Sequence, residues 1–244
     1  MRHRILALSL NYNGEWDRIA EGLKRGEDPG YTELSDPYIT IADPQYPDIL
    51  RTLRYPPWIL FYKGDLTLLQ QPCTAIVGSR NACRYALEMT EQCCRTLPRD
   101  IIVSGLARGV DGQAHRSALR YCKGTIGIAG CGLDKAYPAE NRELYRVLPK
   151  KNLILSEYPP HTAPLAHHFP WRNRLIAGIS RRLLVMQAGY HSGTMITVNE
   201  ALQMGKEVWC LPYPAMDPQG QGCNLLISQG AMILDDPGVL LNEK

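Results

Sequence analysis

Short apolar runs alternate with helically patterned segments along most of this chain. The runs predict strands at residues 74–77, 101–104, 125–129, 153–156, 183–187, 207–211 and 231–234. The segments between them predict helices near residues 84–97, 111–121, 141–147, 172–179, 194–204 and 223–229. Strands that are apolar on both faces and are separated by helices are typical of βαβ units. The pattern therefore predicts an α/β fold with a mostly parallel, doubly wound sheet.

The first 66 residues have a different pattern. Residues 1–36 contain four glycines and modest helical patterning between Trp16 and Leu23, which predicts a small helical extension. Residues 37–66 mix prolines with aromatic residues and predict an extended arm that packs on the core. The arm's aromatic side chains could stack on bases, but segments of this composition more often wrap a core. Residues 67–244 would then form the main domain.

Glycine, hydroxyl and arginine residues follow three of the predicted strands. Gly78-Ser79-Arg80 follows the first, and Ser104-Gly105 with Arg108 follows the second. Ser192-Gly193-Thr194 follows the strand at 183–187. A helix N-terminus offers unpaired N–H groups, and an arginine adds a forked donor that suits phosphate. Since the carboxyl ends of parallel strands share one edge, the sequence predicts an anion or nucleotide site there.

A long loop at residues 158–171 leads directly into Arg172-Asn173-Arg174. Two arginines separated by one residue at the start of a helix favour an anion, whereas a structural pair would more often seek carboxylates. The loop also contains His161, His167 and His168, but a third ligand with metal-site spacing is missing from this pattern. We therefore expect ligand binding by the arginines and no metal.

Composition and charge indicate in which cellular compartment the protein is expected, but they do not indicate its function. The chain has 244 residues, 45% of them hydrophobic, and a net charge of +3, which by itself does not require a nucleic-acid partner. Its eight cysteines form no C-x-x-C pair, so free thiols in a reducing cytoplasm are expected. The apolar run after the basic start is too short for a signal peptide, and no run is long enough to span a membrane.

The order and spacing of several motifs resemble those of the DNA-processing protein A family (DprA/Smf), from near Ile39 to about Ile233. The motifs are Asp43-x-x-Tyr46-Pro47, Lys63-Gly64-Asp65, Gly78-Ser79-Arg80, residues 104–111 with Ala114-His115, Gly130-Cys131-Gly132-Leu133-Asp134, Tyr137-Pro138, residues 156–159, Phe169-Pro170-x-Arg172-Asn173-Arg174, Ser192-Gly193-Thr194 and residues 222–231. The resemblance implies an extended Rossmann-like fold that binds single-stranded DNA and dimerises. It also implies loading of the RecA recombinase during natural transformation, with no catalytic step and no cofactor.

The family's DNA pocket maps onto residues at four places in this sequence. The corresponding positions are Ser79, Arg80, Ser104, Gly105, Arg108, Phe169, Arg172, Asn173, Arg174, Ser192 and Gly193. Asp111 and His115 are expected to brace the turn rather than contact DNA. Gln187 stands where the family usually has an acidic residue, and Pro212-Tyr213 where it has Pro-Gly. The N-terminal extension is short, and we expect the chain to lack the C-terminal winged helix that many members carry.

Two alternatives come from other functional classes. A nucleotide-cleaving or nucleotide-sensing enzyme is compatible with a Rossmann-like fold, and Glu157 is its candidate carboxylate, but no paired base or nucleophile accompanies it. An NAD-dependent oxidoreductase would require G-x-G-x-x-G in a βα turn, and Gly127, Gly130 and Gly132 have the wrong order.

The apolar residues of segment 224–241 exceed what a terminal edge requires. They are Leu225, Leu226, Ile227, Met232, Ile233, Leu234, Val239 and Leu240. We expect this segment to form a homodimer, although the same residues could instead seal the core of the monomer.

Overall fold

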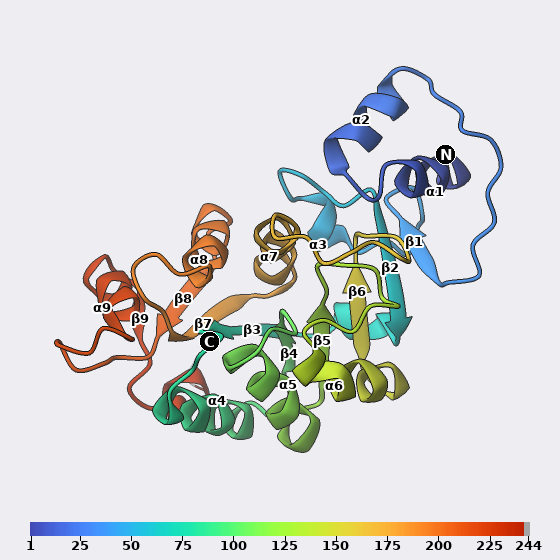
Figure 1. Ribbon diagram of the computed structural model, residues 1–244. Helices are drawn as coiled ribbons and strands as arrows, with labels where there is room; N and C mark the ends of the chain where they lie inside the picture. Colours follow the sequence, from blue (N-terminus) through green and yellow to red (C-terminus); the bar gives the residue numbers. More distant parts are fainter. Residues whose placement is uncertain (242–244) are drawn as a thin grey trace.

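A nine-stranded sheet forms the centre of the computed structural model, which describes residues 1–241 (Figure 1). The strand order is β1-β2-β6-β5-β4-β3-β7-β8-β9. The strands are β1 (Tyr38–Thr40), β2 (Ile59–Gly64), β3 (Cys73–Gly78), β4 (Ile101–Ser104), β5 (Gly124–Ile128), β6 (Leu153–Ser156), β7 (Arg182–Gln187), β8 (Glu207–Cys210) and β9 (Met232–Ile233). The pairs from β6 to β9 are parallel, and β1 and β2 pair antiparallel. The predicted fold class is confirmed.

Helices cover both faces of the sheet. They are α1 (Arg2–Asn11), α2 (Trp16–Lys24), α3 (Asp48–Arg51), α4 (Arg84–Thr96), α5 (Val110–Tyr121), α6 (Arg142–Val147), α7 (His168–Ile179), α8 (Thr194–Gln203) and α9 (Gln221–Ser228). Short 3-10 turns lie at η1 (Leu66–Gln70), η2 (Ala139–Asn141), η3 (Leu148–Lys150) and η4 (Pro237–Leu241). In Figure 1, α4, α5 and α6 lie on one side of the sheet, and α7 and α8 on the other.

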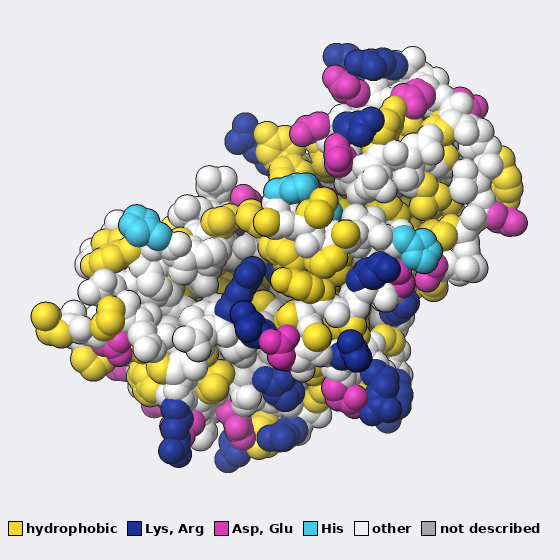
Figure 2. Space-filling model, viewed as in Figure 1, with side chains coloured by type: hydrophobic (Ala, Val, Ile, Leu, Met, Phe, Trp, Pro, Cys, Tyr) yellow, Lys and Arg dark blue, Asp and Glu magenta, His cyan; other side chains and the backbone are white. Residues whose placement is uncertain are grey.

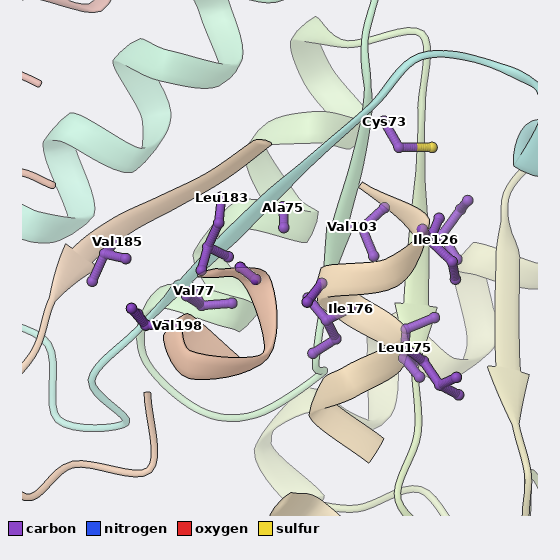
Figure 3. Close-up of a cluster of buried hydrophobic side chains, with 14 of the residues drawn as sticks. Cys73, Ala75, Val77, Val103, Ile126, Leu175, Ile176, Leu183, Val185 and Val198 are labelled. Carbon is purple, nitrogen blue, oxygen red and sulfur yellow. The ribbon is translucent and has the colours of Figure 1, made fainter. Parts of the chain in front are cut away.

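The central strands are buried on both faces, which explains their continuous apolar runs. Along β3, Ala75 and Val77 pack toward α7 and α8, while Ile76 packs toward α4 and α5. Figure 3 shows Leu175 and Ile176 of α7 beside Val103 of β4 and Ile126 of β5. The alternation along the strands thus fixes helices on both sides and leaves the carboxyl edge open.

The seven strands predicted after residue 73 lie where the sequence places them, with ends that differ by at most one residue. The start of α7 differs more, since the helix begins at His168 rather than near residue 172. Pro170 falls in its first turn, where a missing N–H has no consequence. The loop before α7 is therefore shorter than expected.

Residues 37–66 differ from the expected arm, because they extend the sheet. β2 pairs antiparallel with β6, and β1 pairs with β2. Ile59 and Phe61 pack on Ile5 and Leu6 of α1, while Leu60 faces the main core. The prolines flank β2 rather than interrupt it, so this composition still allows two strands at this end of the sheet, with β1 at the edge.

No helix within residues 1–241 combines the length and the apolar character that a membrane-spanning helix requires.

Candidate nucleic-acid interface

A hollow of about 490 Å³ lies at the carboxyl edge of the sheet, between the ends of β3 and β7 and the first turns of α7 and α8. Seven of the eleven predicted site residues line it: Ser79, Arg80, Phe169, Arg172, Asn173, Ser192 and Gly193. Gly105 and Arg108 line a second hollow of about 420 Å³, which shares Arg80 and Phe169 with the first. In Figure 2, dark blue side chains lie at the centre of this face, near β3 and β4. The structure therefore brings nine predicted residues to two adjoining hollows.

The loops after β3 and β4 are held together by their backbones. Gly109 has a φ of +68°, and a Cβ at this position would lie 2.2 Å from the Ser79 carbonyl oxygen. The Val110 N–H donates to that same oxygen at 3.2 Å. A side chain at residue 109 would separate the two loops, so glycine is required here. This contact places Arg80 and Arg108 on neighbouring loops.

Arg80 and Phe169 form the boundary between the hollows. The Arg80 Cζ lies 5.7 Å from the centre of the Phe169 ring, and the Arg80 side chain is exposed. The Tyr137 ring lies 5.5 Å from Phe169 on the side of the second hollow. An exposed guanidinium beside aromatic faces can take a phosphate and a stacked base together.

Arg108 lies at the rim of the second hollow. Its Nη1 is 3.4 Å from Glu140 Oε1, and both side chains are more than half exposed. Surface pairs of this kind contribute little, so Arg108 can exchange its carboxylate for another anion at small cost.

The start of α8 supplies polar groups to the first hollow. Gly193 precedes the helix, and a Cβ on it would meet no atom within 4 Å. The Ser192 hydroxyl is shielded from solvent and has no hydrogen-bond partner within residues 1–241. A shielded hydroxyl without a partner costs about 1–3 kcal/mol, which a bound ligand would recover.

Arg172 holds the floor of the first hollow together. It is 4% exposed, and its Nη1 donates to the Gly105 carbonyl at 2.6 Å and also to the Ile128 carbonyl. Asp111 accepts from the Ala107 N–H at 3.3 Å; burial raises the pKa of Asp111, and the Arg172 charge opposes this shift. Arg172 thus ties α7 to the carboxyl ends of β4 and β5 while it lines the hollow.

Arg174 does not reach either hollow, so the expectation that all the predicted arginines meet there is wrong for this residue. It is buried and forms two bonds of 2.6 Å to Glu157, the residue after β6. Residues two positions apart on a helix point to different sides, which separates Arg174 from Arg172. Arg174 is therefore a structural arginine paired with a carboxylate, which is the alternative that the sequence analysis disfavoured.

Ser104 is also placed differently from the expectation. It is fully buried, and its Oγ donates to the Ile76 carbonyl at 2.6 Å, so the hydroxyl joins β4 to β3 rather than lining a hollow. His115 is buried as well, with Nδ1 2.7 Å from Thr125 Oγ1, and burial lowers the pKa of His115 to about 3. Both residues brace the strands beneath the loops.

Asn81, Thr194 and Tyr137 also line the hollows, although they are not among the eleven mapped site residues. Asn81 directly follows Arg80, and Thr194 and Tyr137 belong to two of the motifs that resemble the family. The sequence therefore held enough information to include them. Within the described part of the chain, no group of three or more His, Cys, Asp or Glu side chains could hold a metal ion.

Comparison with known proteins places this geometry in a family. A family model described as DNA recombination-mediator protein A matches residues 37–243. The chain belongs to this family. It is 40% identical over 199 residues to the DNA processing protein DprA of Streptococcus pneumoniae, covering 81% of this chain and 71% of the relative. It is also 40% identical over 204 residues to the DprA of Bacillus subtilis, covering 82% and 69%.

Solved structures of the family have the same fold. The DprA structure from Streptococcus pneumoniae has a TM-score of 0.83 and 32% identity, and the match covers 99% of this chain and 92% of that one. A Helicobacter pylori DNA processing protein A, whose structure addresses its single-stranded DNA binding mode, has a TM-score of 0.75 and 32% identity. That match covers 85% of this chain and 95% of the Helicobacter protein.

Gln187, at the end of β7, anchors the start of α4. Its Oε1 accepts from the Cys83 N–H at 2.8 Å, and its Nε2 donates to Gln219 at 2.9 Å. A carboxylate could accept the first bond but could not donate the second. The amide of Gln187 thus links the end of β7 to Cys83 and Gln219, and Gln187 is not among the residues that line the first hollow.

Proposed function

We propose that the two hollows bind single-stranded DNA and that this is the protein's function, without a catalytic step. The observation that carries the proposal is the exposed guanidinium of Arg80 over the ring of Phe169, between the two hollows. Phosphate contacts position a strand, and stacking on aromatic rings tolerates any base. Binding that is selective for single strands and insensitive to sequence follows from this combination.

The comparisons support the same function. The family is described as a DNA recombination mediator, and the Helicobacter pylori relative is a single-stranded DNA binder. On this basis we propose that the protein acts in the cytoplasm, protects incoming single strands and loads the RecA recombinase onto them during DNA uptake.

A nucleotide-cleaving function is less well supported by the carboxylates. Glu157 is buried and bonded twice to Arg174, and Asp111 is buried beside Arg172 and accepts from the Ala107 N–H. Glu157 lines neither hollow, and Asp111, which lines the first, is already engaged by the Arg172 charge and the Ala107 N–H rather than free to activate water.

The test is a titration of labelled oligo-dT and of a duplex of equal length, with the wild type and Arg80→Ala. We expect Arg80→Ala to weaken single-strand binding about tenfold and to reduce the slope of log K against log salt by about 0.7, because one phosphate contact is lost. Arg25→Ala is the matched control, since Arg25 is an exposed, ion-paired arginine that follows α2 and lines neither hollow.

Equal affinity of the wild type for duplex, or an unchanged affinity of Arg80→Ala, would contradict the proposal. Hydrolysis of a nucleotide that disappears in Arg80→Ala would favour the enzyme instead.

A further inference from the structure

A basic surface continues from the second hollow over α5 and α6. We call it the α5–α6 basic surface, and its exposed cations are Arg108, Arg116, Arg120, Arg142, Arg146 and Lys150. Figure 2 shows Lys and Arg side chains gathered over these two helices. The exposed carboxylates on the same elements are Glu140 and Glu143, which pair with Arg108 and Arg146. Positive charge therefore remains in excess along α5.

Four of the six cations have no ion pair among the described residues: Arg116 and Arg120 on α5, and Arg142 and Lys150. Arg116 and Arg120 stand one turn apart on α5, and within residues 1–241 neither has a carboxylate at ion-pair distance. Burial and the charge of Arg120 both lower the pKa of Arg116. Like charges at this spacing destabilise a helix, so the arrangement costs stability that a bound anion would restore.

The path from the second hollow to Arg116 is continuous. Arg108 lines that hollow and contacts Glu140, which belongs to η2. The next residue, Asn141, ends η2, and its Oδ1 accepts from Arg116 Nη1 at 3.3 Å. Successive cations thus lead from the site edge of the sheet along α5, away from that edge.

The spacing of the cations fits a chain of phosphates. One turn of α5 separates Arg116 from Arg120 by a rise of about 6 Å. This is comparable to the repeat between phosphates of an extended single strand. A compact anion would bind to one of these arginines, whereas successive phosphates of a polynucleotide can bind to both.

We propose that a single strand held in the hollows continues across the α5–α6 basic surface, where Arg116 and Arg120 bind its phosphates. This inference rests on the proposed function. It predicts that the surface matters only for strands long enough to leave the hollows.

The test compares oligo-dT of about 5 and about 20 nucleotides on the double variant Arg116→Ala/Arg120→Ala. For the long strand we expect the affinity to fall about five- to tenfold and the salt slope to fall by about 1.4, because two phosphate contacts are lost. The short strand should bind as it does to the wild type. Arg116→Lys/Arg120→Lys should retain most of the affinity, since the charges remain.

The matched control is Arg18→Ala/Arg25→Ala, which removes two exposed, paired arginines, one on α2 and one directly after it. Thermal unfolding of each variant checks that the fold is intact. An unchanged affinity for the long strand, or equal losses for both lengths, would overturn the inference.

Arg80→Ala in the same assay separates the two proposals. If Arg80→Ala loses affinity for both the short and the long strand, and the double variant binds both as the wild type does, the role of the α5–α6 basic surface is refuted and the role of the hollows is not. If Arg80→Ala binds both strands with wild-type affinity, the proposal that the hollows bind single-stranded DNA is refuted.

Discussion

Arginine takes different roles at neighbouring positions of this interface. Arg80 is exposed between the hollows, Arg172 is buried against backbone carbonyls, and Arg174 is buried against Glu157. The sequence could predict the loops that carry glycine and arginine, because strand ends and helix starts are local features. It could not predict which side of α7 faces the hollow, since that depends on packing against β6 and the sheet.

The buried imidazole of His115 gives a prediction for stability against pH. Burial lowers its pKa from 6.5 to about 3, so between these values the unfolded chain binds a proton that the folded chain does not. The free energy of unfolding should therefore fall as the pH drops below 6.5, by about 1.4 kcal/mol per pH unit from this residue. Urea unfolding of the wild type and His115→Gln between pH 7.5 and 4.5 measures it.

The free energy of unfolding of His115→Gln should depend less on pH below 6.5 than that of the wild type, whatever the stability of the variant at pH 7.5. Parallel curves for the two proteins would show that His115 does not carry the effect.

At the scale of elements, local patterns identified the central strands because both faces of each are apolar. The bounds of β4 and β6 match the prediction in full. The pair β1 and β2 was missed because its formation depends on β6, a partner far along the chain. The early start of α7 was missed because Pro170 reads as a break, although it stands in a first turn.

The pair of Arg174 and Glu157 fixes α7 to the end of β6, and its removal should be costly. Glu157→Gln leaves a buried guanidinium with a weaker partner, so we expect a loss of about 3–5 kcal/mol in the free energy of unfolding. The double variant Glu157→Leu/Arg174→Met should recover most of this loss, because it buries no charge. Urea unfolding at pH 7.5 compares the three proteins, and a stable Glu157→Gln would contradict the prediction.

At the scale of the whole molecule, the two edges of the sheet differ. One edge ends in β1, and the other ends in β9, where Met232 and Ile233 are each about half exposed. Leu226, Leu234 and Leu240 of the same segment are buried within the monomer. The apolar surface left for a partner is therefore smaller than the sequence indicates and centres on β9.

We propose that this surface forms a homodimer, and sedimentation can test it. The wild type should sediment as a dimer at micromolar concentration, and Ile233→Glu as a folded monomer with weaker binding to long DNA, since two sites on one particle raise avidity. Leu119→Glu, an exposed leucine on α5, is the control and should remain dimeric. A monomeric wild type would refute the proposal.

The antiparallel pairing of β2 with β6 joins two strands that are synthesised at different times. Synthesis proceeds at about 5–20 residues per second, so after Gly64 ends β2 on the order of 5–20 s pass before β6 is complete. During this interval β2 lacks one hydrogen-bonding partner. However, α1 and β1 precede β2 in the chain, and α1 packs on Ile59 and Phe61. The nascent strand can therefore have one face and one edge covered before β6 is complete.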